Sequence, residues 1–134
     1  MTEFTWPVRV YYEDTDSGGV VYYANYLKFF ERARTEFLRS LGFEQDRLRE
    51  GEGVLFAVRS IQVDYRRPAR FNDLLSVTCR VTELKRASVD FFQQARCGEN
   101  LLCQAEVRIA CLDAARFRPR PIPPSLWQVL QTHE

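Results

Sequence analysis

Hydrophobic residues return every three or four positions between Asn25 and Leu41, and charged residues occupy most of the positions between them. This spacing predicts a helix with one apolar stripe along its length. Gly42 follows directly, and glycine is the residue that most often ends a helix in the left-handed conformation. The segment is therefore expected to form one long amphipathic helix.

Alternation of apolar and polar residues predicts strands before and after this helix. The predicted strands are Val8–Tyr12, Leu55–Tyr65, Leu75–Val81, Val89–Cys97 and Cys103–Cys111. The later strands are joined by short connections, among them a hairpin at Cys97–Asn100 and a tight link at Lys85–Ala87. Short links between successive strands favour antiparallel pairing.

The remaining segments are polar or rich in proline. Residues 44–53 are expected to form a polar connection, and residues 116–124 to run extended over the surface. Ser125 is expected to cap a short final helix, Leu126–Gln131. A long apolar helix must bury against one face of the sheet. The fold class is therefore α+β: a single domain over residues 1–134 with a short C-terminal extension from about residue 115.

Composition narrows the class of protein. The chain has 134 residues, of which 46% are hydrophobic and 28% charged, and these values are typical of one globular domain. The net charge of +1 gives no general attraction to nucleic acid or to a membrane surface. We see no signal peptide and no run of about 18 apolar residues that could span a membrane. A cytoplasmic protein is expected.

The cysteines favour a structural role. Cys79, Cys97, Cys103 and Cys111 fall on the apolar phase of the predicted strands, and none forms a C-x-x-C pair. The single histidine, His133, is next to the C-terminus. We therefore expect buried thiols in a reducing compartment, no metal site and no cofactor.

Chemistry is concentrated in the acidic loop Glu13–Gly19, between the first strand and the long helix. A carboxylate in this loop could activate water or attack a carbonyl carbon. Backbone N–H groups at the start of the helix could stabilise the resulting oxyanion. The combination suggests acyl transfer, most simply hydrolysis.

The segment Arg9–Tyr26, which contains this loop, resembles the signature of the 4-hydroxybenzoyl-CoA thioesterase family. Phe29–Glu36 and Val63–Asp73 are similar to its Tol-Pal-associated, YbgC-type branch. The resemblance extends from about Val8 to Leu112. It implies the hotdog fold, a curved antiparallel five-stranded sheet wrapped around one long central helix. It also implies an acyl-CoA thioesterase, for which we expect a short-chain or aromatic acyl group.

The resemblance also implies site residues. It assigns catalysis to Asp16 and polarisation of the thioester carbonyl to the backbone N–H of Tyr23, on the first turn of the helix. Members of the branch often carry histidine where this chain has Tyr23, but a backbone donor does not depend on its side chain. Asp16 could act as a nucleophile that forms an anhydride or as a general base; the sequence leaves both open.

Other residues are candidates for binding the substrate. They are Gly19, Val20, Asn25, Arg66, Arg67, Arg70, Lys85 and Arg86. The basic residues are expected to bind the phosphates of CoA, although charge clusters are usually solvated. Two of these residues have simpler alternative roles: Gly19 could merely permit a tight turn, and Asn25 could merely begin the helix.

The acidic residues of the loop have simpler alternatives. Asp16 could end the strand or cap a turn. Asp14 and Asp16 could together bind a divalent cation. Glu13 and Asp14 are expected to be solvated or supporting groups.

Partners and rival functions complete the expectations. Unpaired sheet edges and the family resemblance favour a homotetramer built from two dimers, with active sites shared between subunits. The first rival is a non-catalytic acyl-CoA-binding or acyl-carrier-protein-docking subunit linked to Tol-Pal or phospholipid metabolism. The second is a hotdog dehydratase, which would need an active-site histidine that the chain does not place. No G-x-S-x-G, G-x-G-x-x-G or Walker motif is present.

Overall fold

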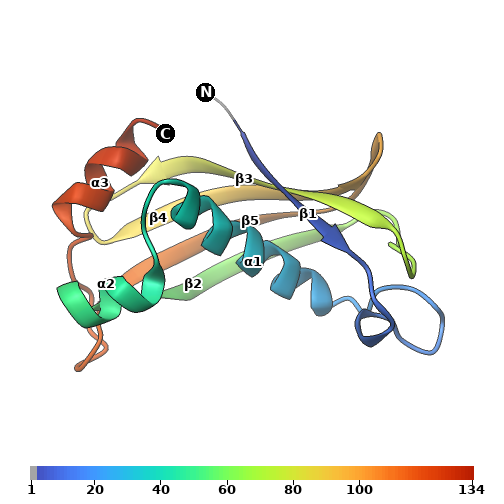
Figure 1. The fold of residues 1–134 in the computed structure, drawn as a ribbon, viewed down its shortest axis with the longest axis horizontal. Coiled ribbons are helices and arrows are strands. Elements are labelled where there is room, and N and C mark those ends of the chain that lie inside the picture. Colours follow the sequence, from blue (N-terminus) through green and yellow to red (C-terminus); the bar gives the residue numbers. More distant parts are fainter. Residues whose placement is uncertain (1–2) are drawn as a thin grey trace.

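A five-stranded antiparallel sheet wraps around one long helix (Figure 1). The structure is a computed structural model and describes residues 3–134. Its elements are β1 (Phe4–Arg9), a 3-10 turn (Tyr12–Asp14), α1 (Asn25–Ser40), α2 (Gln45–Glu52), β2 (Val54–Tyr65), β3 (Leu74–Leu84), β4 (Ser88–Cys97), β5 (Asn100–Asp113) and α3 (Pro124–Gln131). The strand order is β1-β3-β4-β5-β2, and all neighbours are antiparallel. The α+β hotdog fold predicted from the sequence is confirmed.

The apolar stripe of α1 forms the centre of the core. Phe29, Phe30 and Ala33 on this stripe are fully buried against the sheet. Burying one large apolar side chain contributes about 1.5–3 kcal/mol, so this stripe fixes the helix on the sheet. The helix ends as predicted, because Gly42 adopts φ +95° immediately after it.

Helix α1 runs antiparallel to β2. Near the start of the helix, the rings of Tyr26 and Tyr65 have centroids 5.7 Å apart. Near its end, Leu38 lines a common cavity with Phe56. The two ends of β2 are therefore beside opposite ends of α1, which matters for the site described below.

The four cysteines are free thiols, as expected. Cys79, Cys103 and Cys111 are buried, and Cys97 is partly buried. Burial raises the pKa of Cys103 to about 12 and that of Cys111 to about 11. Thiols held protonated in this way are poor nucleophiles, which agrees with a packing role.

Three local predictions are wrong. The first strand spans Phe4–Arg9 rather than Val8–Tyr12, because the Asp14 carboxylate accepts the Tyr11 N–H and bends the chain into the 3-10 turn. Residues 44–53 contain α2; only Leu48 of that helix is buried, so the hydrophobic pattern was too weak to indicate it. The final helix begins at Pro124, with Pro123 in the capping position, so Ser125 is not the cap.

Strands β1 and β2 form the two edges of the sheet. Strand β2 is 12 residues long, and β1 has six. Across residues 3–134, none of the helices is both long enough and apolar enough to cross a membrane.

Candidate active site

Asp16 opens a tight turn between β1 and α1. Its N–H donates to Val20 O (2.9 Å), and its own carbonyl accepts the Gly19 N–H (3.0 Å). Gly19 adopts φ +78°, a conformation that glycine takes without steric cost. Thr15 and Val21 pair across the base of the turn. The acidic loop is therefore a small antiparallel ribbon with Asp16 at its tip.

The Asp16 carboxylate is exposed, and among the residues that the structure describes only one of its two oxygens accepts a hydrogen bond. Its Oδ1 accepts the Gly18 N–H at 2.8 Å. No donor within residues 3–134 hydrogen-bonds to Oδ2. The turn-capping role considered for Asp16 is thus present, and it orients the carboxylate while leaving one oxygen available for reaction.

Asp14 holds the ribbon to the start of α1. It is buried, and its Oδ1 accepts from Asn25 Nδ2 (2.8 Å) while its Oδ2 accepts from Tyr11 N (2.9 Å). Its carbonyl also accepts the Tyr22 N–H (2.9 Å). Asp14 is therefore a supporting group rather than a solvated one. Because donors occupy both its oxygens, it has little capacity to share a cation with Asp16.

This arrangement also assigns Asn25. Ala24 occupies the capping position of α1, and Asn25 is the first residue of the helix. Its amide is used to hold Asp14, so the side chain orients the loop from below. The expected helix start is therefore confirmed, and the side chain in addition supports Asp14; a contact with substrate stays a prediction.

Tyr23 lies two residues before α1, not on its first turn as expected. It belongs to a turn closed by a 2.8 Å hydrogen bond from Asn25 N to Tyr22 O. The Tyr23 carbonyl accepts from the Tyr65 hydroxyl at 2.9 Å, whereas the Tyr23 N–H donates to no group in the described part of the chain. A free donor thus stands at the positive end of a 16-residue helix.

An aromatic surface borders the free donor. The rings of Tyr22 and Tyr23 are 4.7 Å apart, and Tyr23 meets Tyr65 edge-on at 6.2 Å. Hydrogen bonding and charge interaction with Tyr23 raise the pKa of Tyr22, and burial raises that of Tyr65. These phenols stay protonated near neutral pH. Tyr65 was not predicted; its only signal was an aromatic residue at the end of a strand.

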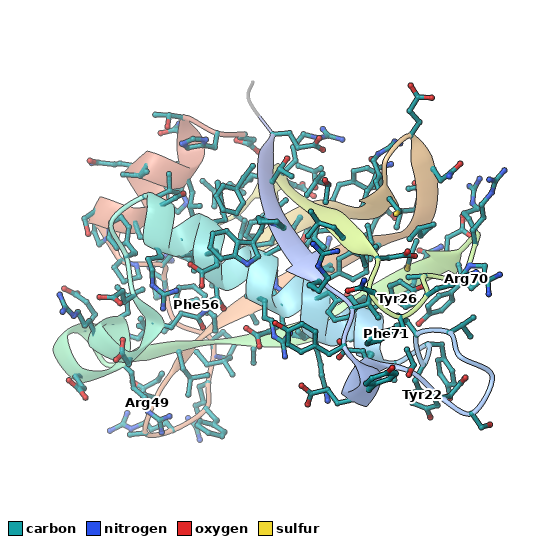
Figure 2. All side chains as sticks on the ribbon, turned by 45° about the vertical axis from the view of Figure 1, so that its right-hand side comes forward. Tyr22, Tyr26, Arg49, Phe56, Arg70 and Phe71 are labelled. Atoms are coloured by element: carbon teal, nitrogen blue, oxygen red, sulfur yellow. The ribbon has the colours of Figure 1, made fainter. Side chains whose placement is uncertain are left out.

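The basic candidates divide into two groups. Val20 pairs with Arg70 in an isolated bridge, so residues 69–70 lie against the acidic ribbon. Arg66 and Arg67 follow β2 in the same connection, where they contact Asp64 (2.7 Å) and Asn100 (3.1 Å). Figure 2 shows Arg70 at the same end of the molecule as Tyr22 and Tyr26.

Lys85 and Arg86 lie elsewhere. They form the link between β3 and β4, at the far end of the 11-residue strand β3. A strand of this length spans about 33 Å. Within one chain the structure therefore does not bring Lys85 and Arg86 to the Asp16 loop.

The chain matches the model of a known family over most of its length. Residues 10–130 match the model of the thioesterase-like superfamily. The chain belongs to the thioesterase-like superfamily. The family resemblance identified from the motif around Asp16 is thereby confirmed, and the relatives below confirm the class of enzyme, a thioester hydrolase.

Individual relatives agree with this family. The chain is 48% identical over 126 residues to the acyl-CoA thioester hydrolase YbgC of Escherichia coli, with 93% of each chain covered. It is 39% identical to the acyl-CoA thioesterase YbgC of Helicobacter pylori over 86% of this chain and 90% of that one. A probable thioesterase from Bartonella henselae superposes with a TM-score of 0.87 at 40% identity, over 91% of this chain and all of that one.

Proposed function

We propose that this thioesterase-like protein hydrolyses acyl-CoA to a free acid and CoA. The observation that supports this most directly is that one short segment before α1 carries both an exposed Asp16 carboxylate oxygen and an unused Tyr23 N–H. The names of the two YbgC relatives support acyl-CoA as the substrate class. A short-chain or aromatic acyl group remains our expectation.

The reaction follows from these two groups. The Tyr23 N–H, helped by the dipole of α1, stabilises the negative charge that develops on the thioester oxygen. Asp16 then attacks the carbonyl carbon to form an anhydride that water cleaves, or it takes a proton from the water that attacks. In both routes the CoA thiolate leaves and is protonated. In the general-base route the oxygen of water ends on the product acid; in the anhydride route it ends on Asp16 or on the product acid, according to which carbonyl carbon of the anhydride water attacks. Asp14 and Asn25 hold the ribbon in place.

Three arginines near the ribbon support a binding site there for the phosphates of CoA. Arg70 is beside the ribbon, and Arg66 and Arg67 precede it in the same connection. Gly19 and Val20 form the tip of the ribbon, where the backbone can approach the thioester. Lys85 and Arg86 can join this site only from another subunit.

We also propose that two chains share each site. The inner side of edge strand β2 exposes Val58, Ile61 and Tyr65. If two β2 strands pair antiparallel about a two-fold axis, the Val54–Val58 half of one chain lies beside the Tyr65 end of the other. Because Tyr65 contacts Tyr23, the partner then borders the reactive loop. Two such dimers would give the tetramer.

Substitution of Asp16 tests the proposal. Asp16→Asn keeps an oxygen for the Gly18 N–H but removes the charge, so release of CoA should fall on the order of a hundredfold or more. Glu13→Gln is a matched control, because Glu13 is an exposed carboxylate in the same loop. The assay should cover short, long and aromatic acyl-CoAs.

Measurements of turnover, binding and isotope incorporation separate the rival functions and mechanisms. A folded Asp16→Asn protein with wild-type turnover would refute the mechanism. A wild-type protein that binds acyl-CoA without turnover would instead indicate a binding or carrier-docking subunit. In single turnover, label from heavy-oxygen water that enters Asp16 supports the anhydride.

A further inference from the structure

A cavity of about 270 Å³ lies between the second half of α1 and the β2 side of the sheet, with α3 closing one end. Its wall is mostly apolar and includes Phe56, Phe91, Ile109 and Leu126. Two charged residues of α1, Glu31 and Arg34, also line it.

The cavity is separate from the Asp16 loop of its own chain. Arg34 is nine residues beyond Asn25 on α1, which corresponds to about 14 Å along the helix axis. Figure 2 shows Phe56 at the opposite end of the molecule from Tyr22 and Arg70. The reaction described above makes no use of this cavity or of Arg34.

Arg34 is a buried cation with unused donors. The residue is 8% exposed, and its Nη1 donates to Gln93 Oε1 at 2.9 Å. No other hydrogen bond leaves its guanidinium within residues 3–134, although a guanidinium carries several N–H donors. In that part of the chain, every side-chain nitrogen or oxygen fully sealed from solvent has a partner. The unused N–H groups therefore reach open space, and the cavity is the open space that Arg34 lines.

Gln93 fixes the direction of the guanidinium. Its side chain is fully buried, and its Nε2 donates to Phe30 O (3.0 Å) and Thr78 O (3.2 Å). The amide is thereby held with Oε1 toward Arg34. Burial lowers the pKa of Arg34, but a guanidinium remains charged in a protein. The cavity thus contains a preoriented positive group in an apolar wall.

We propose that this cavity binds a small apolar molecule that carries a carboxylate, with Arg34 as its anchor. A guanidinium presents a planar fork of donors that matches a carboxylate, and a buried charge whose hydrogen bond within residues 3–134 goes only to a neutral amide is costly. An apolar cavity of about 150 Å³ already admits benzene, so this one has room for a ring or a short alkyl chain. Glu31 opposes the carboxylate only from the exposed rim, where its Oε2 accepts from Thr35 Oγ1 (2.7 Å).

Two sources could supply this chemistry. One is a free carboxylic acid. The other, which rests on the proposed function and on the β2 dimer, is an acyl-CoA whose chain ends in a second carboxylate. In that dimer the cavity end of one subunit is near the Asp16 loop of its partner. The experiment below separates the two.

Binding of octanoate and of octanol should be measured by isothermal titration calorimetry. The variants are Arg34→Met, Glu31→Gln and Val89→Phe, with Arg32→Met as the matched control because Arg32 is an exposed arginine on the same helix. Val89 lines the cavity, so a larger side chain there fills it and leaves the Arg34–Gln93 pair intact. Each variant should be checked for cooperative unfolding.

Arg34→Met should weaken octanoate about ten- to hundredfold and leave octanol unchanged, because it removes only a charge-assisted hydrogen bond. Glu31→Gln should strengthen octanoate, Val89→Phe should weaken both ligands, and Arg32→Met should affect neither. The proposal is wrong if octanoate does not bind at millimolar concentration, or if its affinity is the same with and without Arg34.

Turnover then identifies the source. If Arg34→Met lowers kcat/KM for adipyl-CoA relative to hexanoyl-CoA, the cavity holds the far end of a substrate. If that ratio is unchanged while octanoate binding depends on Arg34, the cavity holds a free acid. A protein that hydrolyses no acyl-CoA would refute the proposed function alone, since octanoate binding is measured independently.

Discussion

Asn25 donates a 2.8 Å hydrogen bond from its side-chain amide to the buried carboxylate of Asp14. This bond joins the start of α1 to the ribbon that carries Asp16. Both groups proposed for catalysis lie within the segment that this bond closes, since Asp16 follows Asp14 in the ribbon and Tyr23 precedes Asn25. The geometry of the site thus depends on a residue pair that does not itself contact the thioester.

Asn25→Ala should therefore lower both stability and activity. The change leaves Asp14 Oδ1 buried without its donor, which costs about 1–3 kcal/mol in the free energy of unfolding. We expect kcat to fall more than KM rises, because the loop loses its orientation while the basic residues remain. Urea denaturation and steady-state kinetics measure the two effects.

Lys28→Ala, an exposed change on the next turn of α1, is the control for the Asn25 variant. It should leave both quantities near the wild-type values. Wild-type kcat in Asn25→Ala would show that the hydrogen bond to Asp14 does not position the loop.

At Tyr23 the contribution of the backbone N–H to activity can be tested separately from that of the phenol side chain. Tyr23→Phe keeps the N–H and should retain most of the activity. Tyr23→Pro removes the donor, and loss of one oxyanion donor costs about a hundred- to thousandfold in kcat. Thermal unfolding should accompany the kinetics, so that a folded but inactive proline variant can be distinguished from a misfolded one. Equal damage from phenylalanine and proline would instead make the phenol a participant.

A bidentate ion pair on the outer face of the sheet predicts a pH dependence of stability. Arg108 donates from Nε and Nη2 to the two oxygens of Asp90, each at 2.9 Å. The hydrogen bonds from Arg108 lower the pKa of Asp90, against a smaller opposing effect of burial. A carboxyl whose pKa is lower in the folded state stabilises it above the unfolded pKa of about 3.9, and this stability is lost as the pH falls through the folded value.

Asp90→Asn should accordingly reduce the free energy of unfolding at pH 7 by about 0.5–1 kcal/mol, a modest value because the pair is partly solvated. The difference from wild type should shrink as the pH falls from about 3.9 through the lower, folded-state pKa of Asp90. Denaturation of both proteins across this range measures it, with Glu99→Gln on the β4–β5 turn as the control. A deficit that persists at the lowest pH would indicate lost packing rather than lost charge.

The sequence predicted those features that depend on repeated patterns. The stripe through Phe29 and Phe30 gave α1 within one residue, and period-two alternation gave the four later strands. Helix α2 was missed because it buries only Leu48, and a single apolar position has no period.

The motif suggested Asp16 and Tyr23 as site residues, which stays a prediction, but contacts between distant residues could not be deduced from it. The Tyr65 hydroxyl reaches the Tyr23 carbonyl across 42 positions, and Arg34 reaches Gln93 across 59. On the sequence, Arg34 was one more charged residue between apolar positions of a helix. Arg34 is buried because the sheet curves around the helix, and a local sequence pattern does not predict that tertiary contact.

The edge strand β2 supplies the last prediction. Ile61 pairs with the buried Val107 and so projects on the inner side of the sheet, yet it is 36% exposed. Long, apolar edge strands are seldom left uncovered in native proteins. If a second copy covers this one, Ile61→Lys places a charge in the contact and should shift the protein toward monomers, as measured by light scattering at assay concentration.

Activity should fall together with the oligomer, because the partner borders the loop of Asp16 and Tyr23. Gln62→Lys is the matched control: it adds the same charge one position along, where Gln62 pairs with the exposed Glu106 on the outer side of the sheet. That variant should remain at least dimeric and active. A monomeric Ile61→Lys protein with full turnover would show that each chain carries a complete site, and the shared-site arrangement would then be wrong.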